Sequence, residues 1–265
     1  WQQKYIFSHI HVLIVEKLLH FKMRSIVDKN NEGVGHIQNG RYSDAKKAFK
    51  TALLHLTVLH QKHQGDEFAD NSTIRIETIT LPESADPAAC EHSFYLYRDA
   101  YLAHIAQSTT SEEQPSTLRE IGCCMTVLIT FNLSLALQYK LDTENLRDLK
   151  KLLRLYKGAW EALQITAKVI PERQTYRDTI AIAILNNTGI TYYYAFSNHS
   201  KARLCFESMK NILLIKDDEN TTIGELMPEV RNGLMMNIFL FATQDFSDNG
   251  QKCMNRQNKV LSFTG

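Results

Sequence analysis

The chain has 265 residues, with 30 Lys and Arg against 29 Asp and Glu; 44% of its residues are hydrophobic and 22% are charged. This length and composition suit a folded domain with a sizeable core and exclude a chain that is disordered throughout. The net charge of +1 gives no overall field that would attract nucleic acid or an anionic membrane. With only 11 Gly and 5 Pro, long helices are favoured over a turn-rich all-β fold.

An apolar run at residues 10–15 opens the chain. The run is too short to span a bilayer, and no small-residue cleavage site follows it, so neither a membrane helix nor a signal peptide is expected. Because the chain does not begin with Met, the part before Met23 is expected to be a fragment of a longer protein or sequence upstream of the natural start. We therefore treat 1–27 as a separate segment and possible helix, 28–244 as the main domain, and 245–265 as a polar tail.

The first strong pattern is a pair of helical segments that meet at Asn39-Gly40. This dipeptide is a turn signal. Either Ser43 or Asp44 can cap the second segment, whose Ala, Phe and Leu residues keep helical spacing until about Gly65. The sequence predicts a helix, a tight turn and a second helix of roughly 20 residues.

Residues 66–117 have a different character. Polar and apolar residues alternate over Thr73–Leu81 and stop at Pro82, which predicts a short strand. Phe94–Tyr97 is either its partner strand or a short helix, and Gln107–Thr117 reads as a linker rich in Ser, Thr, Glu and Pro. We expect this region to be a small β-like or irregular insertion in a helical scaffold.

Helical spacing then resumes, and further helices are predicted over residues 118–139, 142–163, 171–196, 202–215 and 222–241. Pro228 should make the last of these start late or kink. The fold class predicted from these patterns is all-α, with about three helix pairs and a terminal helix.

A repeat is visible around the first turn. Its residues are Asn31, Gly33, Gly40, Tyr42, Ala45, Phe49 and Ala52. Gly33 and Ala45 are expected to touch where the two helices approach most closely, because only small side chains fit there. The Asn-x-small element recurs in two later helices. Its residues and those that follow it are Asn132 and Tyr156, then Asn187, Gly189, Ala202 and Phe206. We interpret Asn31, Asn132 and Asn187 as structural residues that hydrogen-bond between helices.

These spacings resemble the tetratricopeptide pattern, although Lys29 and His36 replace the usual aromatic residues. The chain is also similar, over about residues 25–245, to uncharacterised tetratricopeptide-like proteins expanded in diatoms. The matching stretches are Asn30–Val34, Thr130–Leu137, Leu155-Tyr156 and Asn186–Gly189. This resemblance implies a right-handed α-solenoid of degenerate repeats that serves in protein interaction.

In that family, the first helix of each pair lines a concave face that binds a peptide or protein. The partner-binding residues that the resemblance implies are Asn30, Val34, Ile37, Phe131, Leu135, Asn186, Ile190 and Tyr193. The Lys and Asn with which some members grip a chaperone tail are missing, since the corresponding positions hold Asn30 and Val34 in the first repeat. We therefore expect a non-catalytic scaffold with a protein or peptide partner, and no chaperone-tail binding.

Signals for catalysis or a bound cofactor are missing from the sequence. It contains no G-x-S-x-G, H-E-x-x-H, P-loop or G-x-G-x-x-G motif, so no enzyme and no cofactor are expected. The five cysteines are odd in number, lie far apart except for the adjacent Cys123-Cys124, and form no C-x-x-C, which favours free thiols and an intracellular, cytoplasmic location. His60 and His63 are one turn apart but have no further ligand, so no metal site is expected. An enzyme with its site in the insertion is the least favoured alternative.

One basic stripe supports a competing hypothesis. It consists of Arg147, Lys150, Lys151, Arg154 and Lys157, at helical spacing on the polar side of one predicted helix. Such a stripe is usually a solvated face, and Glu144 and Asp148 dilute it. The alternative function is RNA binding through this stripe. Nothing resembles a one-base-per-repeat code, so nucleic acid remains the less favoured partner, and no membrane partner is expected.

Overall fold

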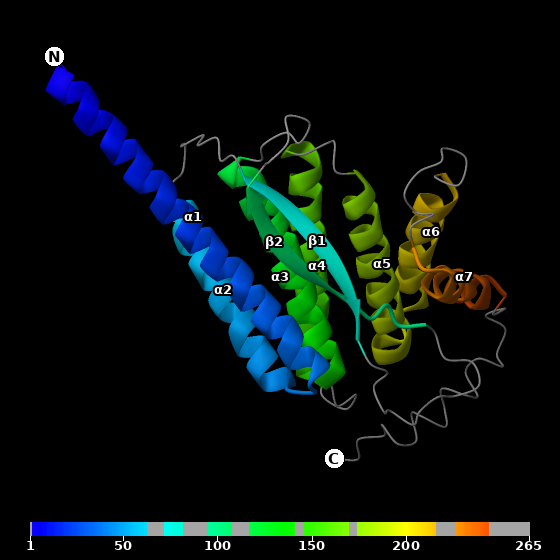
Figure 1. The fold of residues 1–265 in the computed structure, drawn as a ribbon. Coiled ribbons are helices and arrows are strands. Elements are labelled where there is room, and N and C mark those ends of the chain that lie inside the picture. The colour runs from blue at the N-terminus through cyan, green and yellow to red at the C-terminus, as the bar shows by residue number, and fades with distance from the viewer. Residues whose placement is uncertain are drawn as a thin grey trace. The chain divides into compact units, whose positions relative to one another are not determined.

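A computed structural model describes residues 2–62, 72–81, 95–107, 117–140, 146–169, 174–215 and 226–243, with side chains from Leu18 onward. The described residues form seven helices and two strands (Figure 1). They fall into two compact units. The first contains Trp1–Ser84, Arg98–Lys140 and Arg154–Arg177, and the second contains Ala85–Tyr97, Leu141–Leu153 and Asp178–Gly265.

The first unit begins with two helices, α1 (Gln2–Gln38) and α2 (Tyr42–Lys62), which pack side by side (Figure 1). The predicted turn between them is confirmed. Gly40 has a φ of 69°, its N–H bonds Ile37 O at 2.9 Å, and the Arg41 N–H bonds His36 O at 2.8 Å. A residue in the left-handed region is needed to end a helix in this way, and glycine adopts it without strain.

The close crossing of α1 and α2 depends on a glycine, Gly33, which has no side chain. A Cβ atom on Gly33 would lie 2.5 Å from the ring of Phe49, which is fully buried. Ala45 is also fully buried, as predicted, but the three atoms nearest to that added Cβ all belong to Phe49. The Phe49 ring therefore fills the space above the glycine, and a contact of Ala45 with Gly33 stays a prediction.

A reciprocal capping box begins α3 (Leu118–Lys140). Thr117 Oγ1 accepts from the Glu120 N–H at 3.2 Å, and Glu120 accepts from the Thr117 N–H at 2.7 Å. The helix packs on α2, and Phe131 meets the ring of Tyr156 on α4 (Leu146–Val169) at 6.2 Å. Both helices occur where the sequence predicts them.

By length and composition, α3 could cross a membrane. Residues Arg119–Lys140 include an 18-residue window of mean hydropathy 1.7, but 78% of this window is buried inside the protein. A buried core helix passes the same test, so packing accounts for the apolar character of α3.

An antiparallel hairpin belongs to the first unit. β1 (Ser72–Thr80) pairs with β2 (Asp99–Gln107), in a register that runs from Ser72 opposite Gln107 to Thr80 opposite Asp99. The predicted first strand is confirmed. Phe94–Tyr97 was expected to be its partner strand or a short helix, but residues 95–97 belong to neither, and the partner strand β2 begins at Asp99. β2 also packs on α1 and α3 (Figure 1), so this part of the insertion belongs to the core. Most of the predicted linker lies outside the described residues.

The second unit repeats the crossing seen in the first. It contains the first part of α4 (Leu146–Leu153), then α5 (Gln174–Phe196), whose first four residues belong to the first unit, α6 (His199–Ile215) and α7 (Pro228–Thr243). A Cβ atom on Gly189 of α5 would lie 3.0 Å from the Phe206 ring of α6, which is the relation of Gly33 to Phe49. The late start of α7 at Pro228 is as predicted. The starts predicted at Asp142 and Pro171 lie outside the described residues.

Candidate functional site

The main chain of β2 has two edges, and only one of them pairs with β1. Along a strand, the N–H and C=O groups of alternate residues point to the same edge. Tyr101 and Ala103 are such alternate residues, and their main-chain groups bond to asparagine side chains from α1 and α3. These asparagines therefore take the place of a neighbouring strand on the second edge of β2.

Each of two asparagines binds one residue of β2 with both amide atoms. Asn132 Oδ1 accepts from the Tyr101 N–H at 3.0 Å, and Asn132 Nδ2 donates to Tyr101 O at 2.8 Å. Asn31 makes the same pair of bonds to Ala103, at 3.1 and 2.8 Å. A carboxamide carries one acceptor and donors on neighbouring atoms, so it satisfies both polar groups of a residue at once.

A third asparagine links the other two. Asn30 Nδ2 donates to Tyr101 O at 3.0 Å and to Asn31 Oδ1 at 3.2 Å, while Asn30 Oδ1 accepts from Asn132 Nδ2 at 3.0 Å. Asn30 and Asn132 are fully buried. The bonds thus form one closed network, here called the first triad: Asn30, Asn31 and Asn132.

The second unit contains a copy of this network, here called the second triad: Asn186, Asn187 and Asn237. Asn187 binds the N–H and C=O of Tyr97, both at 3.0 Å, and Asn237 binds those of Tyr95 at 2.6 and 2.7 Å. Asn186 Nδ2 donates to Tyr95 O at 2.9 Å and to Asn187 Oδ1 at 3.1 Å, and its Oδ1 accepts from Asn237 at 2.6 Å.

The two triads agree bond for bond. In each, two adjacent asparagines come from one helix, α1 or α5, and the third comes from the next odd-numbered helix, α3 or α7. Their targets are also duplicated along the chain: the second triad binds the first and third residues of Tyr95-Leu96-Tyr97, and the first triad binds those of Tyr101-Leu102-Ala103. The helices and the segment therefore repeat together.

The first tyrosine of each bound tripeptide, Tyr95 or Tyr101, packs closely against the helices of its unit. The ring of Tyr101, which is 1% exposed, lies edge-on to Phe131 at 5.5 Å and to Tyr176 at 6.4 Å. The ring of Tyr95 occupies the space above Gly233 of α7, where an added Cβ would lie 2.3 Å from a ring carbon. The third residues of the two tripeptides, Ala103 and Tyr97, are both fully buried.

Several residues expected to bind a partner lie in or beside the triads. Asn30 and Asn186 are triad members, and Phe131 contacts the tyrosine ring of the bound segment. The others pack within the units: Val34, Ile37 and Leu135 are buried, whereas Ile190 and Tyr193 are half-buried. Their contact with an external partner stays a prediction.

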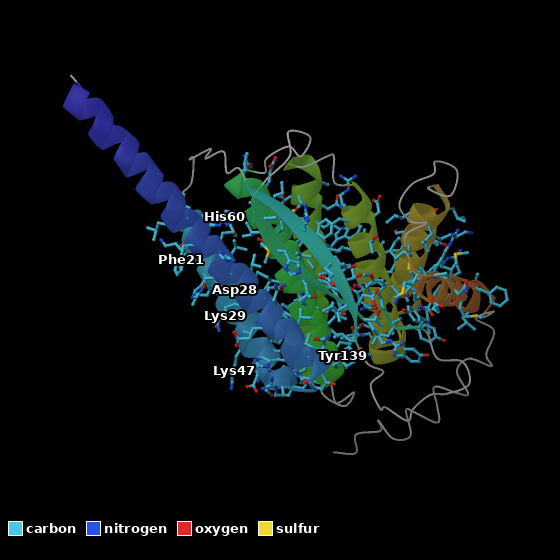
Figure 2. All side chains as sticks on the ribbon, viewed as in Figure 1. Phe21, Asp28, Lys29, Lys47, His60 and Tyr139 are labelled. Carbon is cyan, nitrogen blue, oxygen red and sulfur yellow. The ribbon has the colours of Figure 1, made fainter. Side chains whose placement is uncertain are left out.

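The interpretation of Asn31, Asn132 and Asn187 as links between helices needs a correction. Asn31 and Asn187 bind the main chain of Ala103 and Tyr97, and Asn132 binds both the main chain of Tyr101 and Asn30 of another helix. The other repeat residues fill the crossings. Ala52, Tyr156, Ala202 and Phe206 are buried, and Tyr42 stacks on Tyr139 at 5.7 Å (Tyr139 is labelled in Figure 2).

Sequence reasoning missed Asn237 and the bound segment. Asn237 is a fully buried amide in an apolar helical stretch, which is a signal for a required hydrogen-bond partner. The segment had a signal too, since its Tyr-Leu dipeptide occurs twice, at Tyr95 and again six residues later at Tyr101. No residue of either triad carries an ionisable group, so the site is neutral.

Charged and nucleophilic groups lie elsewhere. Four residues of the basic stripe are exposed on α4 (Arg147, Lys150, Arg154 and Lys157), and Lys157 approaches Glu161 at 3.6 Å. On α1, the hydrogen bond from Lys29 lowers the pKa of Glu32. The side chain of Phe21, also on α1, is 71% exposed on the outer side of the helix (Figure 2).

None of the described cysteines, Cys123, Cys124 and Cys205, forms a disulfide. Burial raises the pKa of Cys205 to about 11 and also raises that of Cys123. Both thiols are therefore held in the protonated, weakly nucleophilic form. Within the part of the chain that the structure describes, no three His, Cys, Asp or Glu side chains gather as a metal site would require.

Comparison with known protein families, curated proteins and solved structures finds no match to this chain. The class that the structure defines is a mostly helical protein whose helices pack in pairs and which carries an inserted two-stranded antiparallel hairpin.

Proposed function

We propose that this chain is a tetratricopeptide-like helical-repeat protein that acts as a non-catalytic scaffold and binds an extended peptide of a partner. The observation that carries the proposal is the pair of asparagine triads, each of which holds an extended piece of chain by its main-chain groups. A site of this kind has the chemistry of peptide binding.

Main-chain recognition explains how such a site can accept a peptide. Each bidentate asparagine supplies the donor and the acceptor that a neighbouring strand would supply. Every residue except proline presents the same N–H and C=O pair. The triad itself therefore recognises the extended main chain of a peptide and not its side chains. Selectivity then rests on the space left for the peptide's side chains.

The triads also favour a binding role over a catalytic one. A neutral carboxamide neither takes up nor gives up a proton at ordinary pH and is not a nucleophile. The repeat assignment is supported separately by two equivalent helix crossings, in which Gly33 packs on Phe49 and Gly189 packs on Phe206. Each of these glycines lies two residues after a triad asparagine.

A test is selection from a display library of random 12-residue peptides on the full chain, followed by titration of the recovered peptides. We expect Asn31→Ala with Asn132→Ala to abolish binding. The matched control is Lys150→Glu with Arg154→Glu on the exposed face of α4, which should leave binding unchanged. Loss of binding in the control alone, together with salt-sensitive binding of mixed-sequence RNA to the wild type, would replace this function with RNA binding.

A further inference from the structure

We infer that the chain's own segment, residues 95–107, is an internal ligand that occupies the triads, and that an external partner is an extended peptide with a Tyr-Leu element that binds by displacing it. The inference rests on the proposed peptide-binding function and adds two things to it. It names the chemistry of the ligand, and it makes binding conditional on release of the segment.

The first argument is the duplication. The triads read only main-chain atoms, so they place no demand on the side chains of the segment that they hold. Yet the segment presents Tyr-Leu to both triads, with Tyr95 and Tyr101 in the same position of the network. A segment that only covers the helices would not need the same Tyr-Leu sequence at both triads. A ligand that binds two equivalent sites would need the same sequence at each of them.

The second argument is the shape of the first site. The Tyr101 ring lies against Phe131 and Tyr176, and two residues later Ala103 is fully buried beside Asn31. The site therefore requires an aromatic residue at one position and a small residue two positions on. Leu102, between them, is half-buried. The ligand class for this site is an extended peptide with the pattern Tyr-Leu-Ala.

The third argument concerns displacement. β2 is tied to α1 and α3 by side-chain amides, and its other edge pairs with the single strand β1. A two-stranded hairpin has little stability of its own in water. An incoming strand would find the same amides on one side and the same β1 edge on the other, so it can make every main-chain bond that the segment makes.

The test uses a fluorescein-labelled synthetic peptide with the sequence of residues 98–107, Arg-Asp-Ala-Tyr-Leu-Ala-His-Ile-Ala-Gln. Its affinity is measured by fluorescence anisotropy for the full-length wild type and for Tyr101→Ala. This substitution weakens the internal segment and leaves the triad unchanged. We expect the variant to bind the peptide at least about tenfold more tightly than the wild type does. The matched control, His104→Ala, changes an exposed residue of β2 and should behave as the wild type.

Two further measurements guard against a folding defect in Tyr101→Ala. Circular dichroism reports whether its helices persist. Ala103→Gln provides a second route to the same state, because its larger side chain cannot fit the fully buried position. Hydrogen exchange at the amide of residue 103, which the wild type protects through Asn31, shows directly whether the segment has left its site.

The outcomes separate the two proposals. Equal peptide affinity in the wild type and in both variants would overturn the internal-ligand inference and leave the proposed function standing. Fast exchange at residue 103 without any peptide binding would overturn both. Equal binding of a probe in which Ala replaces its tyrosine would refute the Tyr-Leu requirement while main-chain binding remained.

Discussion

Asn132→Asp changes a single atom type at the centre of the first triad. The side chain keeps its shape, and one oxygen can still accept from the Tyr101 N–H, as Asn132 Oδ1 does in the wild type at 3.0 Å. The other position held an NH₂ group that donates to Tyr101 O at 2.8 Å and to Asn30 Oδ1 at 3.0 Å. In the variant an oxygen faces these two oxygens, so two attractive contacts become repulsive.

The size of the effect follows from burial, because Asn132 is fully buried. An uncompensated buried charge costs about 3–5 kcal/mol. When the new carboxyl is protonated, its O–H can again donate to one oxygen, and the remaining loss of one hydrogen bond costs about 0.5–1.5 kcal/mol. Burial and the facing oxygens raise the carboxyl pKa in the folded state above its unfolded value. The penalty is therefore full above the folded pKa and is relieved as the pH falls through it.

The assay is urea unfolding of Asn132→Asp and of the wild type, near neutral pH and near about pH 5. The variant should lose about 3–5 kcal/mol at neutral pH and regain part of this loss in acid, relative to the wild type at the same pH. The control is Asn211→Asp on the exposed surface of α6, which should stay within about 0.5 kcal/mol. A cost below about 1 kcal/mol that does not vary with pH would refute the triad geometry.

Two further predictions concern packing and thiol chemistry. Gly33→Ala places a Cβ 2.5 Å from the Phe49 ring and should cost about 1–3 kcal/mol in urea unfolding, whereas Gly35→Ala, with nothing within 4 Å, should stabilise α1 by about 0.5–1 kcal/mol. Equal effects would contradict the crossing. Cys205, with its pKa raised to about 11 from 9.0, should react with iodoacetamide about 100-fold more slowly at pH 8 than an exposed thiol does. Fast labelling of Cys205 in the folded protein would contradict its burial.

The helices could be predicted from the sequence because their signals are local. Asn39-Gly40 marks the turn that Gly40 makes with a φ of 69°, and the apolar spacing before and after it sets the two helices. Pro228 likewise begins α7, because proline suits the first turn of a helix. Such signals depend on residues a few positions apart, so they survive without knowledge of the tertiary structure.

β2 could not be predicted in the same way. Its sequence, Asp-Ala-Tyr-Leu-Ala-His-Ile-Ala-Gln, is rich in alanine and does not alternate cleanly between polar and apolar. Ala100, Tyr101 and Ala103 are all buried, since β1 and the helices cover the strand together. Tertiary packing thus sets a strand whose own β-propensity is weak.

The asparagines show a different limit. The recurring Asn-x-small element singles out Asn31, Asn132 and Asn187 and predicts that they form structural hydrogen bonds, which all three do. Their partners are main-chain groups of Ala103, Tyr101 and Tyr97, and main-chain groups carry no sequence signal. The type of interaction was therefore predictable, and the partner was not.

The repeated use of asparagine follows from the geometry of what is bound. Aspartate has no donor for a carbonyl, serine has one oxygen for two targets, and glutamine has an extra rotatable bond to order. Only a short carboxamide meets the N–H and C=O of one residue together while it holds the strand close to the helix. The same demand acts on Asn132 and on Asn237, which bind Tyr101 and Tyr95 in equivalent ways. Affinity in such a site comes from the main chain, so discrimination between peptides falls to the tyrosine pocket and to the buried position two residues beyond it.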